Sequence, residues 1–535
     1  MKKSLIVFII AVTLGLSACS DLNNIAQEQN ESAGYEPVEY VHNEVVTHDF
    51  DEYIEEFDEL TLNDIINIAN QRRHEINLPC VERVAGLLQD STAFTIREDI
   101  FFNGEFEWLI SREDAIYDTN VFFDILRYCY APYLFFGGDE VFLPVQEKII
   151  ETLNEKDVWK TIDFRDMIYN HISGIIDDNH FVFDGRIVGT SSSFLYSEAS
   201  FYKTDNGFKN RDTGLYVKEI VGYDMNDVFR LTVNECGEFF YIPVVYKTDD
   251  SIRSYDLIFI YEDGSEETLQ LSKHIPRFLF NNEVSLKYER GFPIITLQRM
   301  GNPDSPYFGM QGVEVMEGAR YFLSTASELR DNDVIIVDIR SNIGGQAILP
   351  QIWLYLLMDE TIPNNFIRLK SQVEPVELSE FPLEIQDLIR RYESDRINSP
   401  YIDLTTQFSE MAESNVFPNR INFESEDKVI SNDRLIILLV DRWTSSAGER
   451  FVDQILSMEN TLIIGQNTAG VVLTSACDTL FLPNSNTAFR MSLFMNVFDE
   501  DYFEEGRGIA PDVWVVGDAL TATLAMLESH RIAQK

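Results

Sequence analysis

Two uninterrupted apolar runs constrain the fold of this chain more than any other feature. Val334–Val337 and Leu435–Val440 contain only Val, Ile and Leu. A strand with one face in water alternates apolar and polar residues, whereas a strand buried on both faces is apolar throughout. Helix-like spacing at Gly448–Met458 and a further strand-like run at Thr461–Ile464 continue the alternation. Together these patterns predict an α/β core in which helices cover a largely parallel sheet.

The 535 residues are too many for one hydrophobic core and indicate two to four domains. Helical spacing dominates the part of the chain before Gly185. The strand-like runs Phe239–Val245 and Leu257–Tyr261, with the turn signal Asp263-Gly264, indicate a β-rich part after it. We therefore predict an N-terminal helical module at 57–185, a β-rich middle module at 186–286, and an α/β core at 287–525 with a polar, helix-rich insertion at about 359–427.

The chain is strongly acidic. It has 42 Lys and Arg residues against 89 Asp and Glu residues, a formal net charge of −47 at pH 7. Binding to phosphate backbones requires Lys and Arg to displace counterions, so a nucleic-acid partner is not expected. The acidity also argues against electrostatic docking on anionic lipid. Because 45% of the residues are hydrophobic, the chain is not globally disordered.

The N-terminus has the layout of an export signal. Lys2 and Lys3 precede the apolar run Leu5–Leu16. That run is shorter than the roughly 20 residues that a membrane-spanning helix needs. Leu16–Cys19 resembles a bacterial lipobox, which a signal peptidase cuts before a diacylated cysteine. We predict a lipoprotein signal peptide at 1–18 and lipidation at Cys19; the alternative is an ordinary signal peptide that happens to contain a cysteine.

Residues 19–56 are polar and acidic without clear periodicity, and we interpret them as a tether. Each buried CH₂ of an acyl chain contributes about 0.8 kcal/mol, so two or three chains would hold the protein on a membrane. The expected location is that of an exported bacterial lipoprotein, anchored to a membrane and facing the periplasm or the cell exterior.

The remaining cysteines leave their state open. An exported protein can form disulfides, but buried free thiols are equally compatible with the sequence. Their spacing matches no zinc pattern, and the chain contains no His-Glu-x-x-His, so no metal or other cofactor is expected. These cysteines are Cys80, Cys129, Cys236 and Cys477.

Residues that could carry chemistry follow the two buried strands. In Asp338–Gly345 a pair of glycines lets the backbone approach a ligand and aim N–H groups at an anion. Asp441–Glu449 places serines where a strand enters a helix, a position that exposes a nucleophile. Hydroxyl residues before a helix are also its usual caps. Taken alone, the second segment favours a cap and the first a simple turn.

The order of the motifs changes this interpretation. Asp338–Gly345, Ser445–Glu449, Gly465–Gly470 and Glu505–Asp512 together resemble the C-terminal processing, or tail-specific, peptidase family, which is related to the tricorn core protease. Asp177–Phe181 resembles the Asp-x-His segment of the tricorn-like branch. The resemblance implies a crotonase/ClpP-like α/β core and a serine peptidase that acts on peptides or unfolded proteins.

The resemblance also implies the nucleophile and its base. By position, the nucleophile is Ser446, directly before Ala-x-Glu. One branch of the family activates it with a lysine, but Val471 stands at that place, and the next lysine after Ser446 is Lys535. The other branch uses a histidine, which matches His180 here. An unactivated serine is a poor nucleophile, and histidine is a suitable base because its ordinary pKa is about 6.5.

Four further residues complete the expected site. Glu505 matches the glutamate that orients the histidine, and Asn179 stands where the tricorn-like pattern carries a hydroxyl residue. An amide can still relay a hydrogen bond between a carboxylate and an imidazole. The backbone N–H groups of Gly344 and Ala447 are the expected oxyanion donors.

Two alternatives stay open at this point. Many relatives carry a PDZ domain in the middle, but no clear carboxylate-binding loop is found here, so a divergent PDZ domain and an unrelated β module are both compatible. The chain could also be a non-catalytic ligand- or peptide-binding lipoprotein on the same fold. An α/β-hydrolase esterase is disfavoured because no Gly-x-Ser-x-Gly occurs.

Overall fold

The computed structural model describes residues 60–532, except for 80, 88–106, 191, 250, 280–283, 302–311, 361, 371–415, 418–428 and 499–501. The predicted signal peptide, Cys19, the tether and most of the predicted insertion lie outside these residues. The described parts of the insertion include two strands, at Phe366–Lys370 and Val416–Phe417. No helix among the described residues has both the length and the apolar character needed to cross a membrane.

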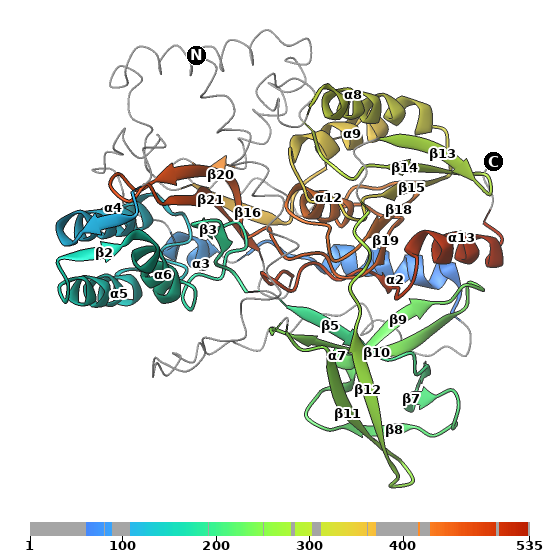
Figure 1. The fold of residues 1–535 in the computed structure, drawn as a ribbon. Coiled ribbons are helices and arrows are strands. Elements are labelled where there is room, and N and C mark those ends of the chain that lie inside the picture. Colours follow the sequence, from blue (N-terminus) through green and yellow to red (C-terminus); the bar gives the residue numbers. More distant parts are fainter. Residues whose placement is uncertain are drawn as a thin grey trace.

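A six-stranded sheet forms the centre of the C-terminal half (Figure 1). Its neighbouring strands are parallel except for the antiparallel pair at the β13 edge. The two apolar runs of the sequence are the adjacent central strands β15 and β18, and every residue of both is buried. In spatial order the strands are β13 (Ser285–Glu289), β14 (Phe292–Thr296), β15 (Val334–Asp338), β18 (Leu435–Val440), β19 (Thr461–Gly465) and β22 (Val513–Trp514).

Helices cover both faces of this sheet (Figure 1). Ile335 and Val337 of β15 pack in one apolar cluster, and Val334 and Ile336 pack in another. This alternation follows from the strand geometry, in which successive side chains point to opposite faces. The first face is covered by α8 (Gly312–Leu329), α9 (Ile348–Met358) and α12 (Ala447–Ile455), and the second by α2 (Leu62–Glu75) and α13 (Ala519–Ser529).

The N-terminal helices share a core with strands from the far end of the chain. Phe122 of the helical part contacts Phe489 at a ring-centroid distance of 5.2 Å. Gly185 lies in the turn of the hairpin β3–β4, which pairs with β21. The helical part comprises α3 (Val81–Gly86), β1 (Leu109–Ser111), α4 (Arg112–Cys129), α5 (Gly138–Leu153), β2 (Val158–Lys160) and α6 (Thr161–Ile172). Its sheet comprises β3 (Val182–Phe183), β4 (Arg186–Ile187), β16 (Phe366–Lys370), β17 (Val416–Phe417), β20 (Thr474–Phe481) and β21 (Ala488–Phe498).

The middle of the chain forms an eight-stranded antiparallel sheet, which lies at the bottom of Figure 1. The elements are β5 (Ser193–Tyr196), β6 (Phe201–Thr204), β7 (Gly207–Asn210), β8 (Val217–Ile220), α7 (Met225–Val228), β9 (Phe229–Val233), β10 (Phe239–Lys247), β11 (Ser254–Tyr261) and β12 (Glu266–Lys273).

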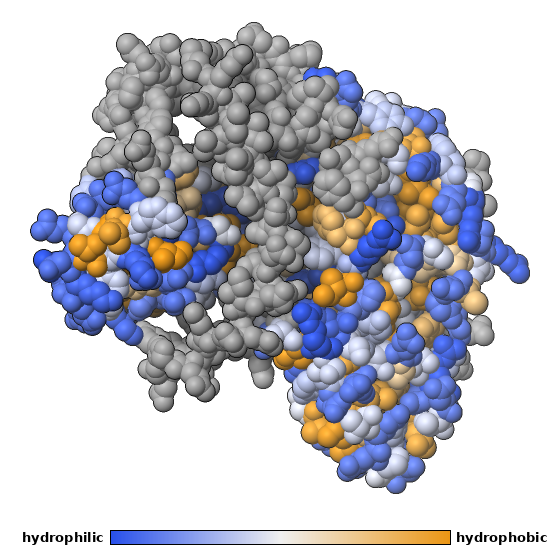
Figure 2. Space-filling model, in the orientation of Figure 1, coloured by the Kyte–Doolittle hydropathy of each residue, from blue (hydrophilic) through white to orange (hydrophobic). Residues whose placement is uncertain are grey.

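Figure 2 shows mainly hydrophilic residues on the face of the molecule that it draws, with hydrophobic residues in small separate groups. Such a surface is typical of a water-exposed protein.

Candidate active site

Ser446 lies in the turn between β18 and α12. Its φ of 53° and ψ of −114° are a combination that residues other than glycine seldom adopt. Strain of this kind is typical of a nucleophile on a sharp strand-to-helix turn. Asp441 holds the turn, because its Oδ1 accepts the backbone N–H groups of Trp443 at 2.9 Å, of Thr444 at 3.1 Å and of Ser341 at 2.8 Å. The strand end thus supports the backbone that carries Ser446.

Glu449 connects the nucleophile turn to the loop after β19. Its buried carboxylate accepts the backbone N–H of Ser446 at 3.0 Å and the N–H groups of Gly470 and Val471 at 2.7 and 2.8 Å. The Thr468 hydroxyl donates to it at 2.7 Å. Burial raises the pKa of Glu449, and these donors act in the opposite direction by stabilising the carboxylate. Val471, which stands where the lysine branch has its base, therefore contributes only a backbone contact.

His180 lies in the segment between α6 and β3, and its side chain reaches the nucleophile. His180 Nε2 is 3.0 Å from Ser446 Oγ, although 266 residues separate them in the chain. The Arg490 Nε–H donates to the His180 carbonyl at 3.2 Å. Burial, with a smaller contribution from the Arg490 charge, lowers the pKa of His180 to about 4. The imidazole is therefore neutral at pH 7, which is the state that a general base requires.

A buried carboxylate fixes the backbone of His180. Asp178 is fully buried, and its Oδ1 accepts the His180 N–H at 2.9 Å and the Thr474 hydroxyl at 3.0 Å. The Tyr130 hydroxyl donates to Oδ2 at 2.8 Å. Burial raises the pKa of Asp178, while the hydrogen bonds oppose this shift. We assigned no role to Asp178 from the sequence, although it belongs to the Asp-x-His segment.

Glu505 and Asn179 do not form the expected relay to the imidazole. Glu505 Oε1 accepts the backbone N–H of Asn179 at 3.1 Å, and its Oε2 accepts the N–H groups of Val472 and Leu473 at 3.2 and 2.9 Å. Asn179 Nδ2 donates to the Gly470 carbonyl at 3.3 Å. Three backbone donors thus occupy the Glu505 carboxylate, and the amide is turned to the backbone. Glu505 supports the segment before the base without touching the base itself.

Within the described parts of the chain, the second ring nitrogen of His180 has no acceptor. Among the described residues, no hydrogen-bond partner contacts the buried Nδ1. Burial and the neighbouring Asp178 charge raise the pKa of Glu505 well above its ordinary value. The His180 imidazole is therefore oriented by the contacts of its backbone and by Ser446.

Of the two expected oxyanion donors, Gly344 is already engaged. Its N–H donates to Asn342 Oδ1 at 2.8 Å, which turns this donor away from a substrate carbonyl. Gly344 still lies directly against the nucleophile, because a Cβ at this position would be 2.8 Å from Ser446 Cβ and 3.0 Å from Ala447 N. Its φ of +90° also favours glycine. Ala447 begins α12, where an N–H has no acceptor within the helix.

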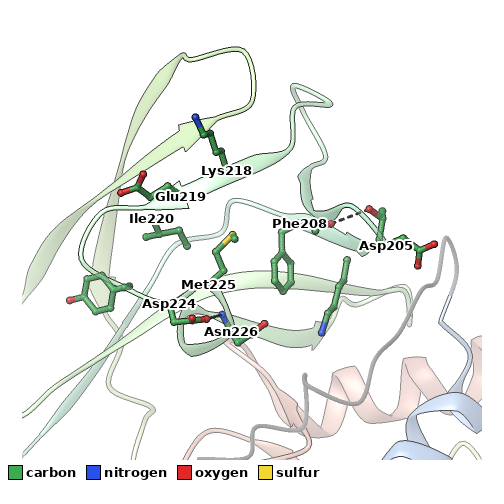
Figure 3. Close-up of a pocket in the computed structure, with 12 residues that line it drawn as sticks. Asp205, Phe208, Lys218, Glu219, Ile220, Asp224, Met225 and Asn226 are labelled. Atoms are coloured by element: carbon green, nitrogen blue, oxygen red, sulfur yellow. Dashed lines mark hydrogen bonds between the residues drawn. The ribbon is translucent and has the colours of Figure 1, made fainter. Parts of the chain in front are cut away.

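A separate pocket of about 810 Å³ lies in the middle sheet, between the β6–β7 hairpin and the β8–α7 segment (Figure 3). Phe208, Ile220 and Met225 line it together with acidic residues and lysines of its rim, such as Asp205 and Lys218. None of the expected catalytic residues contributes to this pocket. Among the described residues, no group of His, Cys, Asp and Glu side chains is arranged to hold a metal ion.

The Ser446–His180 contact, at the start of a helix over a parallel sheet, is an arrangement typical of serine-type hydrolases. Residues 294–515 match the profile of peptidase family S41, which is a family of serine peptidases. The matched segment contains Ser446, Glu449 and Glu505, whereas His180 precedes it. The predicted resemblance to the C-terminal processing peptidases is confirmed.

The solved structures that match this chain share little sequence identity with it. Mature CPAF complexed with lactacystin is 12% identical, with a TM-score of 0.38, over 79% of this chain and 98% of that one. The photosystem II D1 C-terminal processing protease is 12% identical, with a TM-score of 0.32, over 80% and 94% of the two chains. The tricorn protease is 13% identical, with a TM-score of 0.32, over 78% of this chain and 37% of that one. No curated protein sequence matches the chain significantly.

Proposed function

We propose that this S41 peptidase hydrolyses peptide bonds through acylation of Ser446, with His180 as the general base, and that an acylated Cys19 anchors it to a membrane outside the cytoplasm. The observation that carries the catalytic part is the 3.0 Å contact between His180 Nε2 and Ser446 Oγ. The anchor rests on the lipobox-like Leu16–Cys19. Peptides or unfolded proteins are the proposed substrates.

In the proposed reaction, His180 Nε2 takes the proton of Ser446 as Oγ attacks the peptide carbonyl. The Ala447 N–H stabilises the oxyanion, and one such donor typically contributes about 2.7–4 kcal/mol to transition-state stability. The imidazolium then gives its proton to the leaving amine. Water releases the acyl group in a second step that uses the same base. Glu505 and Asp178 keep the segment around His180 in position.

A fluorophosphonate probe tests the proposed activity directly. Because such probes react with activated serines, the full-length protein should become labelled at Ser446, and unfolding of the protein should abolish the labelling. Mass spectrometry of the labelled peptide identifies the residue. Absence of labelling in a folded protein would contradict the proposal and would favour the non-catalytic binding lipoprotein instead.

The pH dependence of kcat/KM tests the state of the base. Only neutral His180 can accept the Ser446 proton, so activity should be full above the folded-state pKa and should fall as the pH drops through it. Because burial lowers this pKa to about 4, we expect full activity at pH 5 and 6 and an acidic limb near pH 4. Activity that halves near the ordinary histidine value of about 6.5 would show that the imidazole is solvated.

A further inference from the structure

Two arginines interact near the start of α12, and one of them, Arg450, follows Ser446 by four residues. Arg450 belongs to α12, and its backbone N–H donates to the Ser446 carbonyl at 3.0 Å. Arg368 belongs to β16, and the charge of Arg368 acts on Arg450. Both side chains lie near the Phe366 ring, because the Arg450 guanidinium is 3.7 Å and the Arg368 guanidinium 5.9 Å from its centroid.

The Arg450 guanidinium has donors without acceptors. Only 9% of Arg450 is exposed. Its Nη2 donates to Asn364 Oδ1 at 3.2 Å, but no hydrogen-bond partner reaches its buried Nε or Nη1 among the described residues. A buried donor that is left unsatisfied costs about 1–3 kcal/mol, and more when it is charged. A site that carries this cost without a partner is prepared for an acceptor that arrives from outside.

The charges around the pair are also unbalanced. Arg368 Nε donates to the neutral Asn496 side chain at 3.1 Å, and the acceptor of Arg450 Nη2, Asn364, is also neutral. Asp453 is the carboxylate whose charge acts on Arg450, but its oxygens accept hydrogen bonds from Asn365 and from the Tyr502 hydroxyl. Burial lowers the pKa of Arg368 to about 10, and burial together with the Arg368 charge lowers that of Arg450.

We infer that Arg368 and Arg450 bind a carboxylate of the peptide substrate, an inference that rests on the proposed peptidase function. A guanidinium presents paired donors that match the geometry of a carboxylate. Arg368 is only partly buried, so a carboxylate can approach the pair from the side of Arg368. The carboxylate can belong to an Asp or Glu side chain or to the C-terminus of the peptide, because both have the same chemistry.

The location limits which carboxylate can bind. Residues four apart in a helix are separated by about 6 Å, and an extended peptide advances roughly 3.3–3.6 Å per residue. A peptide whose scissile bond lies at Ser446 should therefore place the recognised carboxylate within about four residues of that bond. A carboxylate farther along the peptide should have no effect.

The test measures peptide binding to the full-length Ser446→Ala protein by fluorescence anisotropy. Short neutral peptides carry one Glu at successive positions, each with a matched Gln peptide, and each is made with a C-terminal acid and with an amide. We expect one Glu position, or the free acid, to bind at least about tenfold more tightly than its neutral match. The Glu series reports on a side chain and the acid–amide pair on the terminus. If no pair differs by more than about twofold, the inference is wrong.

Arginine variants locate the effect. Arg368→Met and Arg450→Met should each bring the acid-to-neutral ratio close to one while leaving the binding of neutral peptides unchanged. The matched control is Arg290→Met, whose arginine is paired with Glu528 at the surface, and this variant should keep the full ratio. A ratio that survives both Met variants would overturn the assignment to these residues. If Arg450→Met does not fold, the acid-to-neutral ratio of Arg368→Met is the deciding result. Arg368 is partly exposed, so its replacement should disturb folding less.

The two proposals fail in different ways. Binding is measured with a protein that cannot turn over, so loss of the ratio speaks only against the arginine site. If the wild-type protein cleaves none of the peptides while the acid-to-neutral ratio persists, the proposed peptidase activity is wrong and the carboxylate site stands as a binding site.

Discussion

Replacing Ser446 by Ala should lower kcat/KM for a peptide substrate by roughly 10⁵–10⁶-fold. The variant loses the atom that attacks the carbonyl but keeps the backbone N–H that Glu449 accepts at 3.0 Å. Alanine also experiences the same strain at a φ of 53°, so stability should change little. Peptide cleavage measured by liquid chromatography and thermal unfolding measured by circular dichroism check the two parts.

Ser445 provides a matched control for this variant. It neighbours Ser446, and its backbone N–H donates to the Asn342 carbonyl at 2.9 Å, a contact that an alanine retains. Ser445→Ala should therefore keep wild-type activity. If Ser446→Ala still cleaves a peptide at the wild-type rate, or if Ser445→Ala is the inactive variant, the nucleophile has been assigned incorrectly.

Replacing His180 by Ala should reduce kcat/KM by about 10⁴–10⁶-fold, because the serine proton then has no acceptor at 3.0 Å. Labelling by a fluorophosphonate should slow in parallel, since the probe depends on the same activation. The backbone contact from the His180 N–H to Asp178 does not involve the imidazole and should persist. Rates of cleavage and labelling, compared at equal fractions of folded protein, measure the effect.

His171 is the control histidine for this experiment. It lies in α6, and its Nδ1 contacts the Met167 carbonyl at 2.7 Å within the same helix. His171→Ala should therefore lose less than about twofold in activity. Unchanged activity in His180→Ala would mean that another group accepts the proton, and the 3.0 Å contact would then have no catalytic role.

The arrangement around His180 differs from a side-chain relay in a way that matters for catalysis. Glu505 and Asp178 both accept backbone N–H groups of the segment 179–180, so they restrain the position of the base. Neither contacts Nδ1, which is buried without an acceptor among the described residues. The lowered pKa of His180 has other causes, which are burial of the ring and the charge of Arg490.

Arg368 and Arg450 form a local positive region in a protein whose net charge is strongly negative. A net charge of −47 repels acidic peptides at long range, but salt screens that repulsion beyond about 8 Å at physiological ionic strength. Contacts made by buried or partly buried guanidinium groups are screened much less. A peptide carboxylate that reaches Arg368 and Arg450 should therefore be attracted in spite of the surface.

Much of the catalytic half was predictable from local patterns. The run Val334–Val337 and the run Leu435–Val440 are β15 and β18, and the helix expected at Gly448–Met458 is α12 at Ala447–Ile455. Burial on both faces leaves an unmistakable apolar run, and the Ser-Ala-x-Glu motif at the strand end marks the nucleophile turn. The crotonase/ClpP-like label and the module boundaries stay predictions.

The contacts between distant segments were not predictable in the same way. The sequence has no signal that β3, next to His180, pairs with β21, more than 300 residues later. Nor does the sequence show that the Gly344 N–H would donate to Asn342. It also does not show that Glu449 would accept hydrogen bonds from two loops. These outcomes depend on how separate elements pack, and no local pattern encodes them.

The sequence alone determined the kinds of chemistry that this chain offers: a serine at a strand-to-helix turn, a histidine far upstream, and no lysine in the place of the family's other base. Only the tertiary structure decided which of these groups are in contact and what electrostatic environment surrounds them. Residue type and periodicity set local conformation, whereas the distance from an imidazole to a hydroxyl, and the burial that shifts its pKa, arise from packing between segments that are remote in the chain.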